Sequence, residues 1–212
     1  PKLEGWAFTP DSLTVTLSRL DEIMDGPPVA FPDIIGRNYT LFTAAEHFPL
    51  LTTSSWTFER TTNDGQPSER RVSITGSVMQ DGLAYHQFSS AFFAGFSEFR
   101  LEGNSVYALL ENRKAELLRF GVIPGTAWNI GQISEMYLLS GTFLGLESVT
   151  VPAGTYSECL KYEIKTVYGN TSHDAYLLWF AKGIGLVRLE RNLVNYGEVT
   201  EQIIDVLKAF NR

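Results

Sequence analysis

The chain has 212 residues with a formal net charge of -7, and 44% of its residues are hydrophobic. A globular chain of this size can bury a sizeable core without disulfides or metals. The acidic balance, with no run of Lys and Arg, argues against a nucleic-acid partner. The single cysteine, Cys159, excludes an internal disulfide, and no apolar run is long enough for a transmembrane helix.

Residues 1–40 differ from the rest of the chain. Thr9 and Pro10 form a helix-start signal, and Gly26 stands where a helix would end. Apolar residues recur between them at helical spacing, namely Leu13, Leu17, Leu20 and Met24. Three prolines follow within residues 27–38, and proline disfavours helix in the residue before it. The sequence therefore predicts a short amphipathic N-terminal helix followed by an extended connector.

Residues 41–212 have the pattern of one antiparallel β domain. Short segments rich in β-branched and aromatic residues alternate with turn residues, and hairpin signals stand at 63–65, 81–82 and 103–104. The last segment, 199–210, is ambiguous between helix and strand, and the alternation of Glu201, Ile203, Asp205 and Leu207 favours a strand. We therefore expect a mostly β fold of about ten strands, as a strongly curved antiparallel sheet or open barrel.

The β domain also shows a faint internal repeat. Residues 47–120 and 121–210 present similar segments in the same order, which pairs Trp56 with Trp128 and Gly103 with Gly183. Because neither half could bury both faces of its own strands, we expect the halves to join in one sheet. Chance similarity between two β-meanders is the alternative.

The segment FSSAFFAGFSEF, residues 88–99, is unusually rich in phenylalanine. Its alternation breaks at Gly95, which predicts two strands joined by an apolar tip near Ala94 and Gly95. Since hairpin tips usually face water, an apolar tip needs an explanation. It could fold back over the sheet as core, form the mouth of an apolar cavity, or contact a partner or membrane.

Three segments resemble a family of bacterial exported proteins and lipoproteins of unassigned function. The resemblance covers roughly 47–207 and includes the strings FPL, VPAGTYSECLK and WFAKGIGLV. The matching residues are Phe48, Pro49, Leu50, Trp56, Val151, Pro152, Ala153, Gly154, Cys159, Leu160, Lys161, Trp179, Phe180, Ala181, Gly183, Gly185, Leu186 and Val187. The chain departs from the pattern at Lys182, where Pro is usual, and at Thr53 or Ser54, where Gly is usual. A weaker, fold-level similarity links the chain to the half-barrels of periplasmic lipoprotein carriers.

The titratable residues form no recognisable catalytic or metal-binding motif. His47, His86 and His173 lack metal-ligand spacing, and we predict no metal and no cofactor. Cys159 could be a nucleophile, but its position in an alternating segment favours a small, half-buried strand residue on the more polar face. Pairs of acidic residues such as Glu98 and Glu102 fit solvated strand faces, although a hydrolase site remains an alternative.

The leading functional hypothesis is a non-enzymatic exported bacterial protein of the periplasm or cell envelope. A signal peptide or lipid anchor could have preceded Pro1. Its concave face would bind an apolar or lipid-like ligand or an envelope partner. The residues predicted to line that face are Phe92, Phe93, Phe96, Trp56, Trp128 and Trp179. The alternatives are a structural or interaction module with a filled core and, third, a hydrolase.

Overall fold

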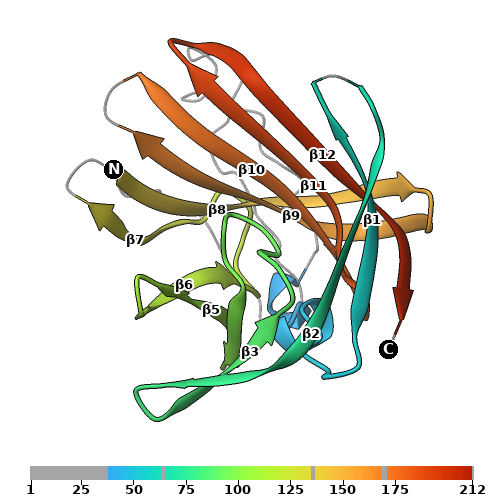
Figure 1. Ribbon diagram of the computed structural model, residues 1–212. Coiled ribbons are helices and arrows are strands. Elements are labelled where there is room, and N and C mark those ends of the chain that lie inside the picture. Colours follow the sequence, from blue (N-terminus) through green and yellow to red (C-terminus); the bar gives the residue numbers. More distant parts are fainter. Residues whose placement is uncertain (1–37, 64, 135–136, 169–170, 212) are drawn as a thin grey trace, which may run out of the picture. The chain divides into compact units, whose positions relative to one another are not determined.

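The computed structural model describes residues 38–63, 65–134, 137–168 and 171–211 (Figure 1). The predicted helix at 9–26 and the connector after it, up to residue 37, lie outside these residues. The described helical elements are the 3-10 turn η1 (Tyr39–Leu41) and the short helix α1 (Ala44–His47). The remainder of the described chain is dominated by strands.

Strands form a single antiparallel sheet that is strongly curved and nearly closed, which confirms the predicted fold class (Figure 1). The described residues contain twelve strands rather than the predicted ten or so, because the second half of the domain also divides into six. The strands are β1 (Ser55–Thr62), β2 (Ser68–Gln80), β3 (Leu83–Phe88), β4 (Glu98–Glu102), β5 (Ser105–Leu110), β6 (Arg113–Arg119), β7 (Ala127–Ser134), β8 (Tyr137–Val151), β9 (Gly154–Tyr168), β10 (Ser172–Ala181), β11 (Gly185–Asn195) and β12 (Glu198–Asn211). The last of these confirms that 199–210 is a strand.

Strands that are consecutive in the chain are neighbours within each half of the sheet. The order runs β6-β5-β4-β3-β2-β1-β12-β11-β10-β9-β8-β7, so each half of the domain supplies six consecutive strands. The halves meet where β1 pairs with β12, in a register that sets Trp56 opposite Phe210 and Arg60 opposite Asp205. The internal repeat itself and the division at residue 40 stay predictions.

Side chains bridge the two ends of the sheet, where β6 and β7 face each other. The indole N–H of Trp128 on β7 donates to the carbonyl oxygen of Glu116 on β6 at 3.1 Å. The hydroxyl of Tyr162 donates to the carbonyl oxygen of Arg119 at 2.9 Å. These donors satisfy backbone acceptors that a neighbouring strand would otherwise bind, and they protect part of the sheet edge.

Helix α1 is held between two turns of the sheet. Asn104, in the β4–β5 turn, accepts a hydrogen bond from the backbone N–H of Ala44 at 2.8 Å. The backbone N–H of Gly183, in the β10–β11 turn, donates to the carbonyl oxygen of Glu46 at 2.7 Å. The chain therefore leaves α1 at a fixed position, and this places Phe48 against the inner face of the sheet.

Candidate functional site

The segment between β3 and β4, residues 89–97, folds back onto the inner face of the sheet, and we call it the plug. Its tip is at Ala94 and Gly95, which have φ values of 49° and 82°. Phe92, Phe93 and Phe96 are 1%, 3% and 6% exposed. Of the three interpretations of this apolar tip, the structure therefore shows the one in which it packs as core.

The plug completes a cluster of aromatic rings. The ring of Phe92 lies 5.0 Å from that of Trp56 and 4.9 Å from that of Phe88, measured between centroids. The ring of Phe48 lies 6.2 Å from that of Phe93 and 5.9 Å from that of Phe180. The space between Phe48, Trp56, Phe88 and Phe92 has no room for a water-sized molecule. This end of the inner face is filled by the chain itself.

The three predicted tryptophans occupy different places. Trp56 belongs to the aromatic cluster, and its indole N–H donates to the carbonyl oxygen of Ile184 at 2.7 Å. Trp128 lies at the contact between β6 and β7. Trp179 alternates with Phe180 along β10 and so lies on the opposite face of the sheet. This placement differs from the predicted one on the concave face.

Long basic side chains explain why Trp179 is buried on the outer face. Lys161 and Arg188 stand opposite it on the neighbouring strands, with cationic groups 4.8 Å and 5.3 Å from its ring. Their methylene stems cover the indole while the charges stay near water. The structure does not test whether any of the six predicted residues binds a ligand.

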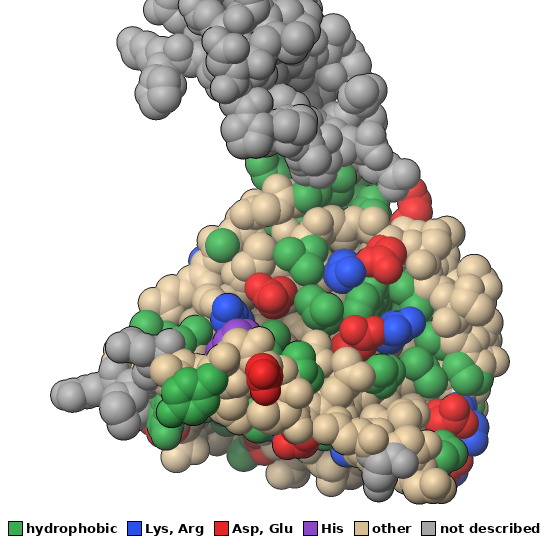
Figure 2. Space-filling model, turned by 90° about the horizontal axis from the view of Figure 1, so that it is seen from above, with side chains coloured by type: hydrophobic (Ala, Val, Ile, Leu, Met, Phe, Trp, Pro, Cys, Tyr) green, Lys and Arg blue, Asp and Glu red, His purple; other side chains and the backbone are tan. Residues whose placement is uncertain are grey.

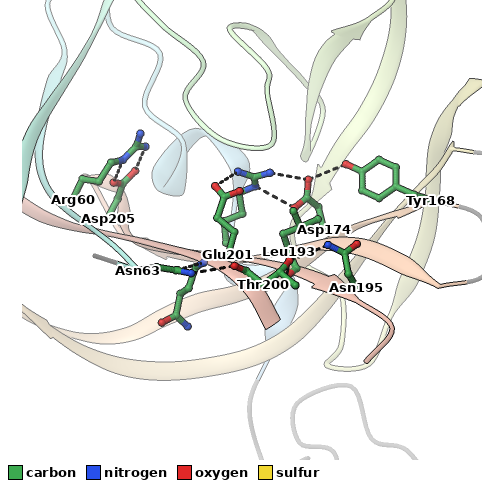
Figure 3. A network of polar contacts seen from close by, with 11 residues as sticks. Arg60, Asn63, Tyr168, Asp174, Leu193, Asn195, Thr200, Glu201 and Asp205 are labelled. Atoms are coloured by element: carbon green, nitrogen blue, oxygen red, sulfur yellow. Dashed lines mark hydrogen bonds and ion pairs between the residues drawn. The ribbon is translucent and has the colours of Figure 1, made fainter. Parts of the chain in front are cut away.

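A charged cluster that sequence reasoning missed lies on the inner face beside the plug. Asp205 on β12 is completely buried and accepts two hydrogen bonds from Arg60 on β1, at 2.7 and 2.8 Å (Figure 3). It also accepts one from Arg70 on β2 at 2.8 Å. The hydrogen bonds to Asp205 raise the pKa of Arg60, whereas burial lowers the pKa of Arg70. Both arginines therefore share one carboxylate.

A second polar group follows on the same inner face toward the β9–β10 turn. Arg191 on β11 bonds the carboxylate of Asp174 at 3.1 and 3.2 Å and that of Glu201 at 3.0 Å. The hydroxyl of Tyr168 donates to Asp174 at 2.8 Å (Figure 3). Burial and this hydrogen bond raise the pKa of Tyr168, so its hydroxyl stays protonated near neutral pH.

The sequence feature that could have revealed these charged groups is the alternation of charged residues along the last strand. Glu201 and Asp205 alternate with the same spacing as Leu207, which is completely buried. Residues two apart in a strand share a face, so the spacing places both carboxylates on the same side of the sheet as Leu207. Such carboxylates require basic partners, and Arg60 and Arg191 supply them from neighbouring strands.

An open depression lies between the segment after α1 and strands β3 and β4. It has a volume of about 620 Å³. Six of its eight lining residues have aliphatic side chains, but polar and apolar atoms contribute similar shares of its exposed surface. The lining residues are Ala45, Pro49, Leu50, Leu51, Ala84, His86, Arg100 and Leu101. His86 pairs directly with the inward-facing Phe99, which places its side chain on the inner side of the sheet. Its Nδ1 is buried without a hydrogen-bond partner among the described atoms.

The remaining candidate residues for chemistry are dispersed. His47, His86 and His173 lie on α1, β3 and β10, and no group of metal-ligating side chains was found among the described residues. Cys159 is completely buried rather than half-buried, and Glu158 before it has a positive φ. Burial, followed by the charge of Glu147, raises the pKa of the Cys159 thiol to about 11.

The outer surface is mixed in character. On the face shown in Figure 2, acidic and basic side chains are interspersed with hydrophobic ones. Ion pairs on the outer surface include Lys161–Glu147 and Lys114–Glu102. No helix in the part of the chain that the structure describes is long and apolar enough to cross a membrane.

Comparisons with known proteins gave matches among solved structures. The chain is similar to a proposed lipoprotein from Parabacteroides distasonis, at 15% identity and a TM-score of 0.45, over 78% of this chain and 99% of that one. It is also similar to a proposed exported protein with a YmcC-like fold from Bacteroides fragilis, at 17% identity and a TM-score of 0.47, over 79% and 99% of the two chains. No protein-family model matches the chain, and no curated protein matches it either.

Proposed function

We propose that this is a non-enzymatic, exported bacterial protein of the cell envelope that binds an apolar, lipid-like ligand. The observation that carries the binding proposal is the depression of about 620 Å³ beside α1. Binding sites for small molecules are concave and of this size, and they combine apolar surface with polar groups that orient the ligand. His86 and Arg100 are the polar members of the lining. Export is supported by the sequence resemblance in the FPL, VPAGTYSECLK and WFAKGIGLV segments.

A neutral apolar dye, N-phenyl-1-naphthylamine, tests the depression directly. Leu50 and Leu101 line it from opposite sides, so Leu50→Gln and Leu101→Gln should each weaken dye binding about tenfold or more. Leu138→Gln is a matched control, because Leu138 is 49% exposed and does not line the depression. Equal binding by all three variants and the wild type, or no binding by any, would refute the proposal.

The second candidate is a structural or interaction module with a filled core. The packed aromatic cluster favours it, because no ligand-sized space exists between Phe48, Trp56 and Phe92. Such a module would bind neither the dye nor lipid, and would instead co-purify with an envelope protein when isolated from its own cell envelope.

A further inference from the structure

One arginine joins the middle of the plug to the sheet. Nη2 of Arg70 donates to the carbonyl oxygen of Phe92 at 2.8 Å and also to that of Ala91. The other terminal nitrogen of the same guanidinium bonds the buried carboxylate of Asp205 at 2.8 Å. One side of Arg70 is therefore fixed to the sheet, and its other side offers donors to the plug.

Two charged groups lie on the inner face. Arg191, Asp174 and Glu201 form one group with one net negative charge. Arg60 and Arg70 share Asp205, so the group next to the plug carries one net positive charge. The plug meets this charge with neutral backbone carbonyls. A carboxylate in the same place would neutralise it and would accept stronger, charge-assisted hydrogen bonds.

The plug places oxygen acceptors first and an apolar group after them, as a fatty acid places its carboxylate and its tail. Its acceptor oxygens lie at Arg70, and the ring of Phe92 continues from them into the apolar cluster, 6.2 Å from the ring of Phe58 and 5.0 Å from that of Trp56. We propose that the plug is the internal occupant of a closed binding site, whose ligand is a single-chain amphiphile with a carboxylate head. Its head would replace the Ala91 and Phe92 carbonyls at Arg70, and its tail would replace the Phe92 ring.

The backbone of the plug allows it to move as a unit. Two of its hydrogen bonds are internal, from the N–H of Phe92 to the carbonyl of Phe96 at 2.7 Å and from the N–H of Phe96 to that of Phe93 at 3.0 Å. At its base, the N–H of Ser89 bonds the carbonyl of Ser73 on β2 at 2.8 Å. Displacement about this base would keep the internal bonds and leave a cavity lined by aromatic rings, a type of site that binds apolar molecules.

The wild-type protein provides the primary test, with dodecanoate as the probe. Dodecanoate should bind, and it should increase amide hydrogen exchange across residues 89–97. Dodecyltrimethylammonium has the same tail with a positive head, and it should do neither. If dodecanoate leaves the exchange of 89–97 unchanged, the proposal is wrong. Protection of 44–51 alone would also refute it, while leaving the proposed depression in place.

Variants separate the tail site from the head site. Phe92→Ala weakens the plug and keeps Arg70, so it should bind dodecanoate at least tenfold more tightly than the wild type. Phe143→Ala is the matched control, since Phe143 is also 1% exposed but lies in β8, and it should bring no gain. Adding Arg70→Gln to Phe92→Ala should lower the preference for dodecanoate over dodecyltrimethylammonium at least tenfold. Equal behaviour of Phe92→Ala and Phe143→Ala would overturn the proposal, and the exchange experiment decides it if Phe92→Ala does not fold.

Discussion

Replacing Asp205 with Asn should destabilise the protein more than removing any exposed carboxylate. Asp205 is completely buried and accepts three hydrogen bonds from Arg60 and Arg70. Asn is similar in shape but neutral, so two guanidinium groups would lose their counter-charge. Removing one partner of a buried ion pair costs about 3–5 kcal/mol.

The lower part of that range applies here. The side chain of Arg60 is 32% exposed and can regain water, whereas that of Arg70 is only 13% exposed and cannot do so fully. We therefore expect a loss of about 3 kcal/mol in the free energy of unfolding. For a domain of this size, such a loss lowers Tm by about 6–12 °C.

Urea denaturation followed by tryptophan fluorescence measures this loss. The matched control is Glu102→Gln, because Glu102 also bonds two basic side chains, Arg100 at 3.3 Å and Lys114 at 2.7 Å, but at the surface. The control should leave the urea midpoint near the wild-type value. A midpoint shift for Asp205→Asn no larger than for Glu102→Gln would refute the reasoning.

Three further predictions concern other parts of the fold. Burial lowers the pKa of both His47 and His86, so the unfolded chain takes up protons that the folded chain binds less readily as pH falls below about 6.5. Stability should therefore decrease from pH 7 towards pH 5.5, and His47→Gln should reduce that slope in urea titrations. A Cβ at Gly141 would lie 2.4 Å from the Trp128 ring, so Gly141→Ala should cost about 1–3 kcal/mol and shift the fluorescence maximum, whereas Gly76→Ala, with nothing within 4 Å, should do neither. Cys159 should react with iodoacetamide at pH 8 only after unfolding, and rapid labelling of the native protein would contradict its burial and its raised pKa.

The fold class was predictable because its signals are local. Turn residues such as Asp81–Gly82 adopt positive φ where the sequence placed hairpins, and the alternation in 199–210 identified a strand despite a competing helical pattern. The break at Gly95 likewise located the plug tip. Each of these inferences used only the conformational preferences of adjacent residues, which tertiary packing did not override.

The faces of the strands were harder to predict. Leu178, Trp179 and Phe180 are all buried, so β10 shows no alternation that would tell its inner side from its outer side. The burial of Trp179 depends on Lys161 and Arg188, which come from other strands. Similarly, the carboxylate of Asp205 is stabilised on the inner face by Arg60 and Arg70, whose register with β12 and β1 is a long-range property.

The sequence alone could not show that the inner face of the sheet is filled. By composition, the phenylalanines of the plug were compatible with a core, which the sequence favoured, and also with a cavity mouth or a contact surface. The choice between them depends on Phe48 and on Arg70, which contact the plug from parts of the chain far from it in sequence.

Nuclear Overhauser contacts between the Trp56 indole and the Phe92 ring test most directly whether the plug fills the inner face. Their ring centroids are 5.0 Å apart, and the Trp56 indole N–H is hydrogen-bonded to Ile184. The unliganded protein should therefore show strong cross-peaks between the two rings and slow exchange of the Trp56 indole proton. Cross-peaks from Phe92 only to its neighbours in sequence, together with rapid exchange of that proton, would show that the plug lies outside the sheet.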